Sequence, residues 1–396
     1  MIPVAIIFDN FGPYHIARLQ AAAVACDLVA IEVAGASATY AWKNDAMAGS
    51  FKRVTLIEQG TSGDVSRSEL VRRLERTLDQ FKPGVVVVPG WASPAAWGVM
   101  RWCLRNRTPM ICMSESTAWD EPRVGWKEWI KKKLVGLFSS ALVGGERHRD
   151  YLTKLGMPSE RIFCGYDAVD NAFFHSRAEA IRSDAGKIRR QYGLPQDYFL
   201  ASARFVEKKN LSRLLEAYAI YRGSSENPAS LVLLGDGPLR SALEAKRDAL
   251  DLRDCVVMPG FKQVADLPAY YALARAFVHP STIEPWGLVV NEAMACGLPV
   301  LVSNKCGCAP ELVRDGVNGF IFDPLDVEGM ARNMARVSAS DFPQAAFGEK
   351  SEEIVAEWCP ERFARGLSQA IEAALNLPPV SSSSVESGLL WILQRR

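Results

Sequence analysis

The sequence predicts an α/β protein built from two doubly wound, Rossmann-like domains that face each other across a cleft. Short apolar runs bounded by turn residues alternate with helix-compatible segments, which is the pattern of a parallel sheet with helices on both faces. The alternation stops at an irregular, Arg-rich stretch around residues 175–190 and then restarts. The length of 396 residues also exceeds the roughly 150 that one domain usually takes.

Five apolar runs in the first half of the chain predict the strands of the first sheet. They lie at residues 4–8, 28–33, 84–89, 110–113 and 141–145. Six runs after the Arg-rich stretch predict the second sheet, at residues 198–203, 230–235, 255–260, 276–281, 298–303 and 319–322. Ligands of open α/β sheets bind beyond the carboxyl ends of the strands, so the loops after these runs are where we expect function.

The last residues of the chain differ in character. A helix is expected at 360–375, and the serine run at 381–384 begins a segment, 381–396, that we expect to be a mobile tail. The domain division predicted from these features is 1–175 for the first domain and 176–359 for the second.

Composition excludes several classes of protein. Lys and Arg number 46 against 45 Asp and Glu, so no basic excess favours nucleic acid. The longest uncharged stretch, 84–100, contains two prolines and is too short to span a bilayer, and Asp9 interrupts what would be a signal peptide. We therefore expect a cytoplasmic protein. The close cysteine pair, Cys306 and Cys308, lacks the further ligands and spacing of a zinc site.

The segment 281–303 is the most informative for chemistry. It predicts a strand end, a tight turn and a helix, so the main-chain amides of Trp286, Gly287 and Leu288 would lie at a helix N-terminus, where anions bind. Glu284 precedes this helix and Glu292 lies inside it. Taken alone, the pair could be a helix-start carboxylate and a solvated helix residue, or an acid and nucleophile flanking a glycosidic bond.

A second cluster lies at 202–218, where a strand ends and a helix begins. Arg204 and Lys209 would both lie at this exit and could face one polyanion, although an exposed basic loop is the alternative. Gly235 and Gly237 follow the next strand but do not form the GxGxxG pattern of dinucleotide-binding folds, so a nicotinamide enzyme is disfavoured.

These residues resemble a known family. Glu284, Trp286, Gly287, Leu288 and Glu292 match, position by position, the C-terminal motif of retaining GT-B glycosyltransferases of family 4, also called glycosyl transferases group 1. The resemblance also covers Arg204 and Lys209, which in the family clamp the diphosphate of the donor, and the region of Phe261, which holds the nucleobase. It is strong over residues 195–330 and architectural elsewhere.

The first half resembles the family less closely. Gly12 follows the first strand where the family has a glycine-rich loop near the donor phosphates and the acceptor, and His15 could bind either sugar or serve as a capping or packed histidine. At the exit of the strand at 110–113, where many members carry a histidine, this chain has Ser114 and Glu115. The catalytic partner from this domain is therefore left open.

The resemblance implies transfer of a hexose from a nucleotide diphosphate sugar, UDP-sugar favoured over GDP-sugar, to a glycan or lipid-linked glycan in surface polysaccharide biosynthesis. Arg204, Lys209 and the helix tip would stabilise the departing phosphate without a metal or other cofactor, Glu284 would position the donor sugar, and Glu292 would bind the ribose. It also implies that the helix at 360–380 packs back on the acceptor-side domain. A nucleotide-sugar epimerase and a non-catalytic nucleotide-sugar-binding protein are the alternatives.

Residues 125–138 predict a helix suited to the surface of a membrane. At 100° per residue, Trp126, Trp129, Ile130, Lys133 and Leu137 fall on one side, and lysines 131–133 could meet anionic headgroups. The alternative is an ordinary surface helix that packs Trp129, Ile130, Leu134 and Leu137 against its own domain.

Overall fold

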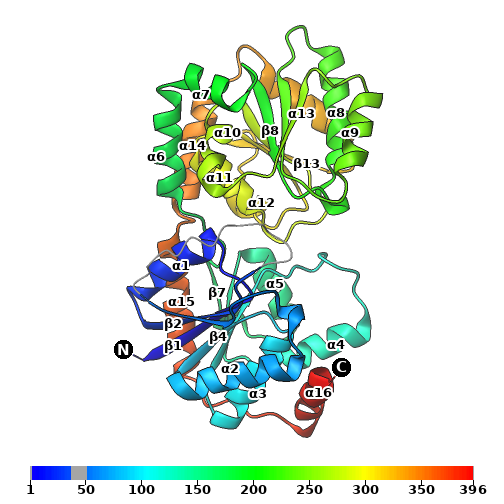
Figure 1. The fold of residues 1–396 in the computed structure, drawn as a ribbon. Helices are drawn as coiled ribbons and strands as arrows, with labels where there is room; N and C mark the ends of the chain where they lie inside the picture. Colours follow the sequence, from blue (N-terminus) through cyan, green and yellow to red (C-terminus); the bar gives the residue numbers. More distant parts are fainter. Residues whose placement is uncertain (1, 37–50, 396) are drawn as a thin grey trace. The chain divides into compact units, whose positions relative to one another are not determined.

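The computed structural model describes residues 2–36 and 51–395, which form two compact units (Figure 1). Unit 1 comprises Met1–Ala168 and Pro360–Arg396, and unit 2 comprises Val169–Cys359. The first boundary thus lies slightly earlier than the expected position between 175 and 176, and unit 2 is inserted into the chain of unit 1.

Unit 1 contains a seven-stranded, wholly parallel sheet in the order β3-β2-β1-β4-β5-β6-β7. Five of the strands are those that the sequence predicts. The edge strands β3 and β7 were not predicted, because one begins with two charged residues and the other has only three residues. The strands are β1 (Pro3–Phe8), β2 (Asp27–Ala34), β3 (Lys52–Ile57), β4 (Val85–Pro89), β5 (Met110–Ser114), β6 (Ser140–Val143) and β7 (Ile162–Cys164).

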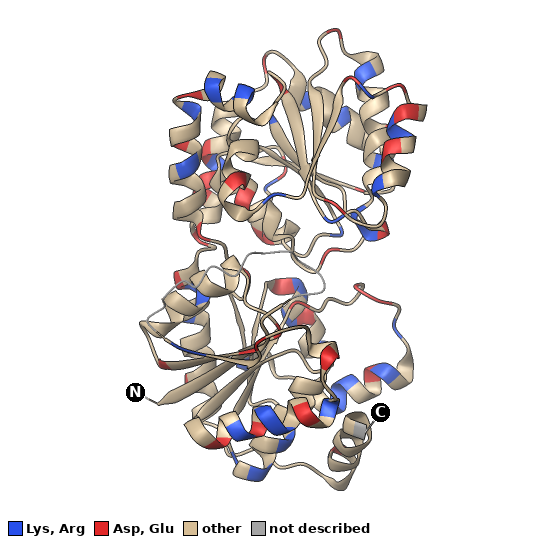
Figure 2. Ribbon diagram, in the orientation of Figure 1, with Lys and Arg blue, Asp and Glu red and all other residues tan. Residues whose placement is uncertain are grey.

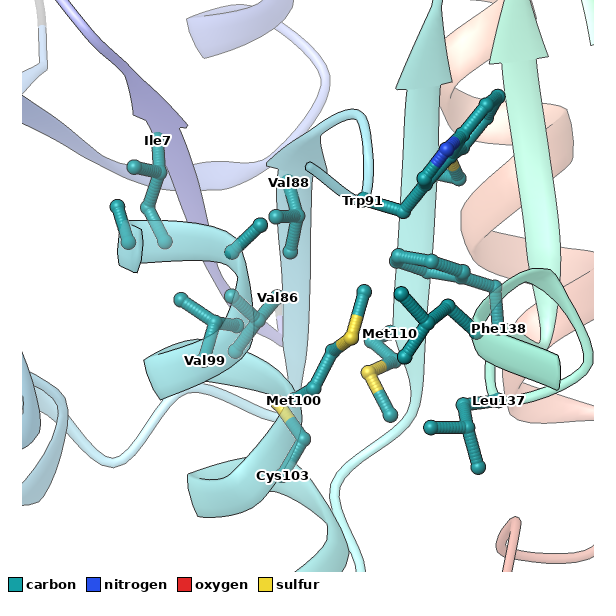
Figure 3. Close-up of a cluster of buried hydrophobic side chains, with 14 of the residues drawn as sticks. Ile7, Val86, Val88, Trp91, Val99, Met100, Cys103, Met110, Leu137 and Phe138 are labelled. Carbon is teal, nitrogen blue, oxygen red and sulfur yellow. The ribbon is translucent and has the colours of Figure 1, made fainter. Parts of the chain in front are cut away.

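Both faces of this sheet are covered, because its strands are apolar on both sides. On β1, Val4, Ile6 and Phe8 belong to one buried cluster, and Ala5 and Ile7 belong to another. Figure 3 shows the second cluster, in which side chains of β1, β4 and α3 meet those of 137–138. The helices of unit 1 are α1 (Pro13–Ala23), α2 (Arg67–Phe81), α3 (Pro94–Asn106), α4 (Gly125–Val135), α5 (Glu146–Lys154), α15 (Pro360–Leu375) and α16 (Ser384–Arg395).

Helix α15 is part of the core of unit 1 although it comes after unit 2 in sequence. Its residues Phe363 and Leu367 are buried in the same cluster as Val4 and Phe8 of β1. The Ser140 hydroxyl donates a hydrogen bond of 2.7 Å to a main-chain carbonyl of α15. Part of one face of the first sheet is therefore covered by a helix that follows unit 2 in sequence.

The expected mobile tail is helical over α16. Leu390 on this helix is buried against α3 in the core of unit 1, and Leu393 packs beside it. The apolar run at 389–393, rather than the preceding serines, decides the structure of this segment. None of the helices in the described ranges has both the length and the apolar character that crossing a bilayer requires.

Unit 2 contains a six-stranded parallel sheet in the order β10-β9-β8-β11-β12-β13, and all six strands are those that the sequence predicts. They are β8 (Tyr198–Ser202), β9 (Ser230–Leu234), β10 (Val256–Gly260), β11 (Ala276–His279), β12 (Val300–Ser303) and β13 (Gly319–Phe322). The strand order reverses between β8 and β11. The carboxyl ends of these two central strands lie at one edge, which is where doubly wound sheets bind ligands.

The helices of unit 2 form two layers. Helices α8 and α13 pack together over one buried cluster, while α6, α10, α11 and α14 pack against one another in the other layer (Figure 1). The helices are α6 (Asn171–Arg182), α7 (Ala185–Tyr192), α8 (Leu211–Ser224), α9 (Arg240–Ala249), α10 (Leu267–Ala272), α11 (Leu288–Ala295), α12 (Ala309–Leu312), α13 (Val327–Ser338) and α14 (Gln344–Ala356).

Candidate functional site

The candidate site of unit 2 is built from the loops that follow β8 and β11. The two loops are joined directly, because the main-chain N–H of Thr282 donates to the carbonyl of Lys208 over 2.9 Å. The side chain of Asn210 also holds these loops together. Its side-chain amide donates to the carbonyls of Pro280, at 3.0 Å, and Pro324, at 2.8 Å. The backbone around Lys209 is therefore held against the exits of β11 and β13.

Lys209 and Glu284 form an ion pair at this junction. The side chains are only 16% and 10% exposed, so the pair is largely screened from water. The accepting oxygen, Oε2 of Glu284, also lies 2.8 Å from His279 Nε2 and 3.3 Å from the Ser281 hydroxyl. Across residues 2–36 and 51–395, no hydrogen bond reaches the other oxygen, Oε1, which is thus available to a ligand.

The protonation states of this cluster follow from its burial and its charges. Burial alone would raise the pKa of the Glu284 carboxyl, but the Lys209 ammonium and the hydrogen bond from His279 outweigh burial and hold that pKa well below its usual range. Burial lowers the pKa of His279, against the opposing pull of Glu284. At neutral pH the cluster therefore contains a carboxylate, an ammonium and a neutral imidazole.

Helix α11 begins directly over this cluster. Gly287, its N-cap, has φ of 106°, in the left-handed region that favours glycine. A Cβ at this position would lie 3.3 Å from Glu284 Cγ and 3.5 Å from His279 Nε2. Glycine thus allows the first turn of α11, with its outward-facing amides, to approach the carboxylate closely.

Trp286 contributes to this site through its main chain only. Its side chain is buried, its indole N–H donates to Asn291 Oδ1 over 2.9 Å, and its ring lies 4.8 Å from that of Trp358. Of the predicted residues 286–288, the contact to a ligand therefore comes from the backbone amides. The indole instead anchors the turn that carries them.

The other predicted residues of unit 2 lie at the same sheet edge with different exposure. Arg204 is exposed after β8 and forms no ion pair within the described part of the chain, and Phe261 is partly exposed after β10. Glu292 is buried on α11, so it is not the solvated helix residue that was one interpretation. Gly235, at the exit of β9, allows the loops after β8 and β9 to pack closely, because the Cβ of any other residue at this position would clash with the carbonyl oxygen of Ala203.

In unit 1, Gly12 and His15 form the start of α1. The Gly12 N–H donates to His15 Nδ1 over 3.0 Å, so the histidine does cap the helix. Burial, with Arg18 nearby, holds the pKa of His15 well below its usual range. The neutral ring accepts at Nδ1 and carries its proton on Nε2, which makes it a hydrogen-bond donor toward any ligand. Capping and ligand binding are therefore compatible roles.

Ser114 and Glu115 lie at the carboxyl end of β5, as predicted. The Ser114 hydroxyl is buried and accepts from the N–H of Ser116 over 3.2 Å, whereas Glu115 is half-buried. Ser114 therefore shapes the loop, and Glu115 is the better placed of the two to meet an acceptor. In the ranges 2–36 and 51–395, no three His, Cys, Asp or Glu side chains are grouped to hold a metal ion.

Sequence reasoning missed three residues of the unit 2 site: His279, Ser281 and Asn210. His279 is the last residue of β11, and a polar residue at the end of an otherwise buried strand is the signal that could have revealed it. Ser281 follows two residues later. Asn210 has φ of 57°, a conformation that asparagine tolerates better than most residues, but this is visible only in the structure.

Residues 184–354 match the family described as Glycosyl transferases group 1. This segment includes the Lys209–Glu284 cluster and helix α11. Unit 2 is a glycosyl transferases group 1 domain. The family resemblance that the motifs carry is thereby confirmed.

Relatives of the group 1 domain include named enzymes. Alpha-D-kanosaminyltransferase of Streptomyces kanamyceticus is 28% identical over 212 residues, which is 53% of this chain and 54% of that protein. The GDP-mannose-dependent alpha-(1-6)-phosphatidylinositol monomannoside mannosyltransferase of Mycolicibacterium smegmatis is 31% identical over 41% of this chain and 44% of that protein. The chain spans about half the length of the curated relatives it matches.

Among solved structures, HepE of Anabaena in complex with UDP and glucose superposes with a TM-score of 0.76 at 18% identity, covering 94% of this chain and 100% of that one. The likeness extends over both units. It confirms the expected GT-B fold, in which a group 1 domain accompanies a second Rossmann-like domain.

Proposed function

We propose that the chain is a retaining glycosyltransferase that transfers a hexose from a nucleotide diphosphate sugar to a hydroxyl of a glycan or lipid-linked glycan. The observation that carries the proposal is the Lys209–Glu284–His279 cluster beneath the first turn of α11. It combines a cation and the main-chain amides of a helix N-terminus for a diphosphate with a carboxylate, ionised at neutral pH, for sugar hydroxyls. The match to the group 1 family supports this assignment of unit 2.

In the proposed reaction the bond between the anomeric carbon and the β-phosphate oxygen breaks, and a bond from the acceptor oxygen to the same carbon forms. Attack from the face that the phosphate leaves retains the configuration. The proton of the acceptor hydroxyl passes to the departing phosphate oxygen. Arg204, Lys209 and the amides of residues 286–288 stabilise the negative charge that develops on the phosphate, and no metal is required.

Glu284 and Glu292 have separate roles in this proposal. Three donors hold Oε2 of Glu284, so the carboxylate is fixed in place and Oε1 accepts hydrogen bonds from the donor sugar. Glu292 binds the ribose. Main-chain groups near Phe261 bind the base. His15 donates from Nε2, and Gly12 and Glu115 contribute from unit 1 to the binding of the acceptor.

A UDP-sugar is the favoured donor, and surface polysaccharide biosynthesis the favoured context. A structural neighbour was solved with UDP and glucose, and one relative is named an O-antigen chain mannosyltransferase. The Mycolicibacterium relative is named for GDP-mannose, so a GDP-sugar is the competing donor.

The test is a screen of labelled UDP-, GDP- and other nucleotide sugars, with nucleotide release and product configuration as readouts. Transfer or slow hydrolysis supports the proposal, an isomerised sugar identifies an epimerase, and saturable binding without turnover identifies a binding protein. We expect Arg204→Ala to lower turnover about 10²-fold or more, because one lost donor to a developing charge costs on the order of 3 kcal/mol. Lys208→Ala, the same charge change on the same loop, is the matched control.

We further propose that the protein acts at the inner face of a membrane, which α4 contacts. Trp126 and Trp129 on this helix are 63% and 49% exposed, while Leu134 and Leu137 pack in the core. The alternative of an ordinary surface helix is thus right for Ile130, Leu134 and Leu137, which pack on unit 1, and wrong for Trp129. Lys131 is bound by the carboxylates of Glu121 and Glu128 and is largely buried, so the cations that remain for headgroups are chiefly lysines 127 and 132.

A further inference from the structure

Helix α16 has two apolar faces, of which the fold uses one. Leu390 and Leu393 pack into unit 1 against α3. Away from these two leucines, Val385 and Ile392 lie seven residues apart on one side of the helix and are 47% and 45% exposed. Trp391, 52% exposed, lies between that side and α3. Large apolar side chains grouped on the surface of one helix are unusual in a water-facing position and mark an interaction surface.

Helix α16 lies next to the lysine-rich helix α4, and the two contact each other (Figure 1). Lys133 Nζ on α4 is 3.2 Å from Glu386 Oε1 on α16. The exposed indoles of Trp126 and Trp129 belong to α4. Two segments more than 240 residues apart in the sequence thus bring exposed aromatic and aliphatic side chains to one region of unit 1.

The charge around this region is positive but partly neutralised. Helices α3 and α4 together carry six Lys or Arg and a single Glu (Figure 2). Carboxylates pair with Lys131 and Lys133, so the positive charge left for a partner is chiefly that of lysines 127 and 132. The combination of tryptophans, aliphatic residues and lysines is typical of segments that lie in the interface of an anionic bilayer.

We propose that α16 and α4 together form an anchor for an anionic lipid bilayer, in which Val385, Trp391 and Ile392 insert alongside Trp126 and Trp129. The proposal rests on the membrane contact proposed for α4, and adds a second, independent element to it. The anchor is selective for anionic lipid because lysines 127 and 132 remain exposed beside it.

A hollow between α3 and α16 supports a lipid as the occupant. It has a volume of about 430 Å³ and is lined by both polar and apolar side chains, as a phosphate headgroup joined to an acyl chain requires. Its lining residues are Arg101, Leu104, Ser382, Ser387, Leu390 and Trp391. The Arg101 guanidinium donates one hydrogen bond to Gln394 Oε1 and keeps further N–H groups for an anionic headgroup, while the Ser382 and Ser387 hydroxyls bond each other.

A second copy of the chain fits this surface less well. A symmetric dimer places the same patch on both sides of the interface, so lysines 127 and 132 of one copy would face those of the other. Like charges that meet in an interface oppose association. An anionic bilayer instead neutralises them.

The test is flotation of the full chain with vesicles of phosphatidylcholine alone or mixed with phosphatidylglycerol. We expect binding to the mixed vesicles, and the double variant Trp391→Ser, Ile392→Ser to weaken partitioning about tenfold or more, because two large apolar side chains no longer enter the interface. Ile220→Ser with Leu325→Ser is the matched control, since these unit 2 side chains are 47% and 61% exposed but far in sequence from the anchor. The control is expected to bind as the wild type does.

Hydrogen exchange of the wild type gives a readout that needs no substitution. Mixed vesicles should slow exchange across 385–393, and unchanged exchange there overturns the proposal. The proposal is also overturned if the α16 double variant binds fully while the double variant Trp126→Ser, Trp129→Ser does not bind. In that case α4 alone makes the membrane contact. A dimer in light scattering that the α16 variant dissociates, with no vesicle binding, overturns it in favour of self-association.

The proposed transfer reaction is tested separately by donor hydrolysis in solution. The α16 variant should retain that activity and the thermal transition of the wild type. If no donor is turned over but vesicle binding depends on α16, the proposed function fails and the anchor stands. If donors are turned over but vesicles are not bound, the anchor fails and the reaction stands.

Discussion

The Lys209–Glu284 ion pair should couple strongly to the stability of unit 2. Unit charges about 4 Å apart attract by about 4 kcal/mol at an effective dielectric constant of about 20. Desolvation of two side chains that are only 16% and 10% exposed offsets part of this attraction. We therefore expect a net coupling free energy of about 1.5–3 kcal/mol in a double-mutant cycle of Lys209→Met and Glu284→Gln.

The single variant Lys209→Met is the informative member of the cycle. Among the described residues, it leaves the buried Glu284 carboxylate with His279 and Ser281 as hydrogen-bond partners and without a cation. The free energy of unfolding should therefore fall by more than the coupling free energy of the pair, because a buried charge is left uncompensated. Glu284→Gln should be milder, because an amide oxygen can still accept from the same donors.

The assay is hydrogen exchange of peptides covering 276–303, which reports the opening free energy of unit 2 independently of unit 1. Lys350 and Glu353 provide the matched control in the same unit. Their ion pair is 2.6 Å long but the side chains are 50% and 62% exposed, so the expected coupling is only about 0.3–0.5 kcal/mol. Equal coupling for the two pairs would refute the argument from burial, and with it the claim that Glu284 is held ionised.

Three further predictions concern the same unit. Glu292→Ala should weaken the binding of free nucleotide, because the proposed ribose contact exists before and after transfer; calorimetry measures it, and unchanged affinity contradicts that role. Gly287→Ala should lower the free energy of unfolding, measured by urea denaturation, by about 1–3 kcal/mol, because the φ of Gly287 is 106°. The control Gly223→Ala lies within α8, where an added Cβ meets no atom within 4 Å, and should stabilise the fold slightly. The pKa of Glu284 is depressed in the folded state, so the stabilisation that its carboxylate contributes is complete above the unfolded pKa of about 4.3 and is lost as the pH falls toward the folded pKa. The difference in unfolding free energy between wild type and Glu284→Gln should therefore shrink as the pH is lowered. A difference that grows would contradict the assignment.

The central strands and the turn before α11 could be predicted from the sequence because local pattern determines them. Runs such as 85–88 are apolar at every position, as strands buried on both faces must be. The turn and helix expected within 281–303 are present, with Gly287 in the turn as the N-cap of α11. The edge strand β3 has no such pattern, because it begins with two charged residues and only its last two residues are buried.

The rest depends on tertiary contacts that no local pattern encodes. That Trp286 points into the core follows from Asn291 and Trp358, the latter more than 70 residues away in the sequence. The partnership of Lys209 with Glu284 joins two loops that only the sheet order β8-β11 brings together. The helix at 384–395 was missed because its serine-rich start suggested disorder, whereas Leu390 finds a place in the core of unit 1.

Because α15 covers one face of the first sheet, the order of synthesis leaves that face incomplete for a time. When the ribosome has finished unit 1 as far as residue 168, the face of β1 that Phe363 and Leu367 later cover is still bare. At about 5–20 residues per second, translation of Val169–Cys359 delays those residues by roughly 10 to 40 s, long enough for unit 2 to fold first. The nascent chain thus carries a finished domain and an unfinished one at the same time, and the apolar surface that α15 later covers is the part exposed to aggregation during that interval.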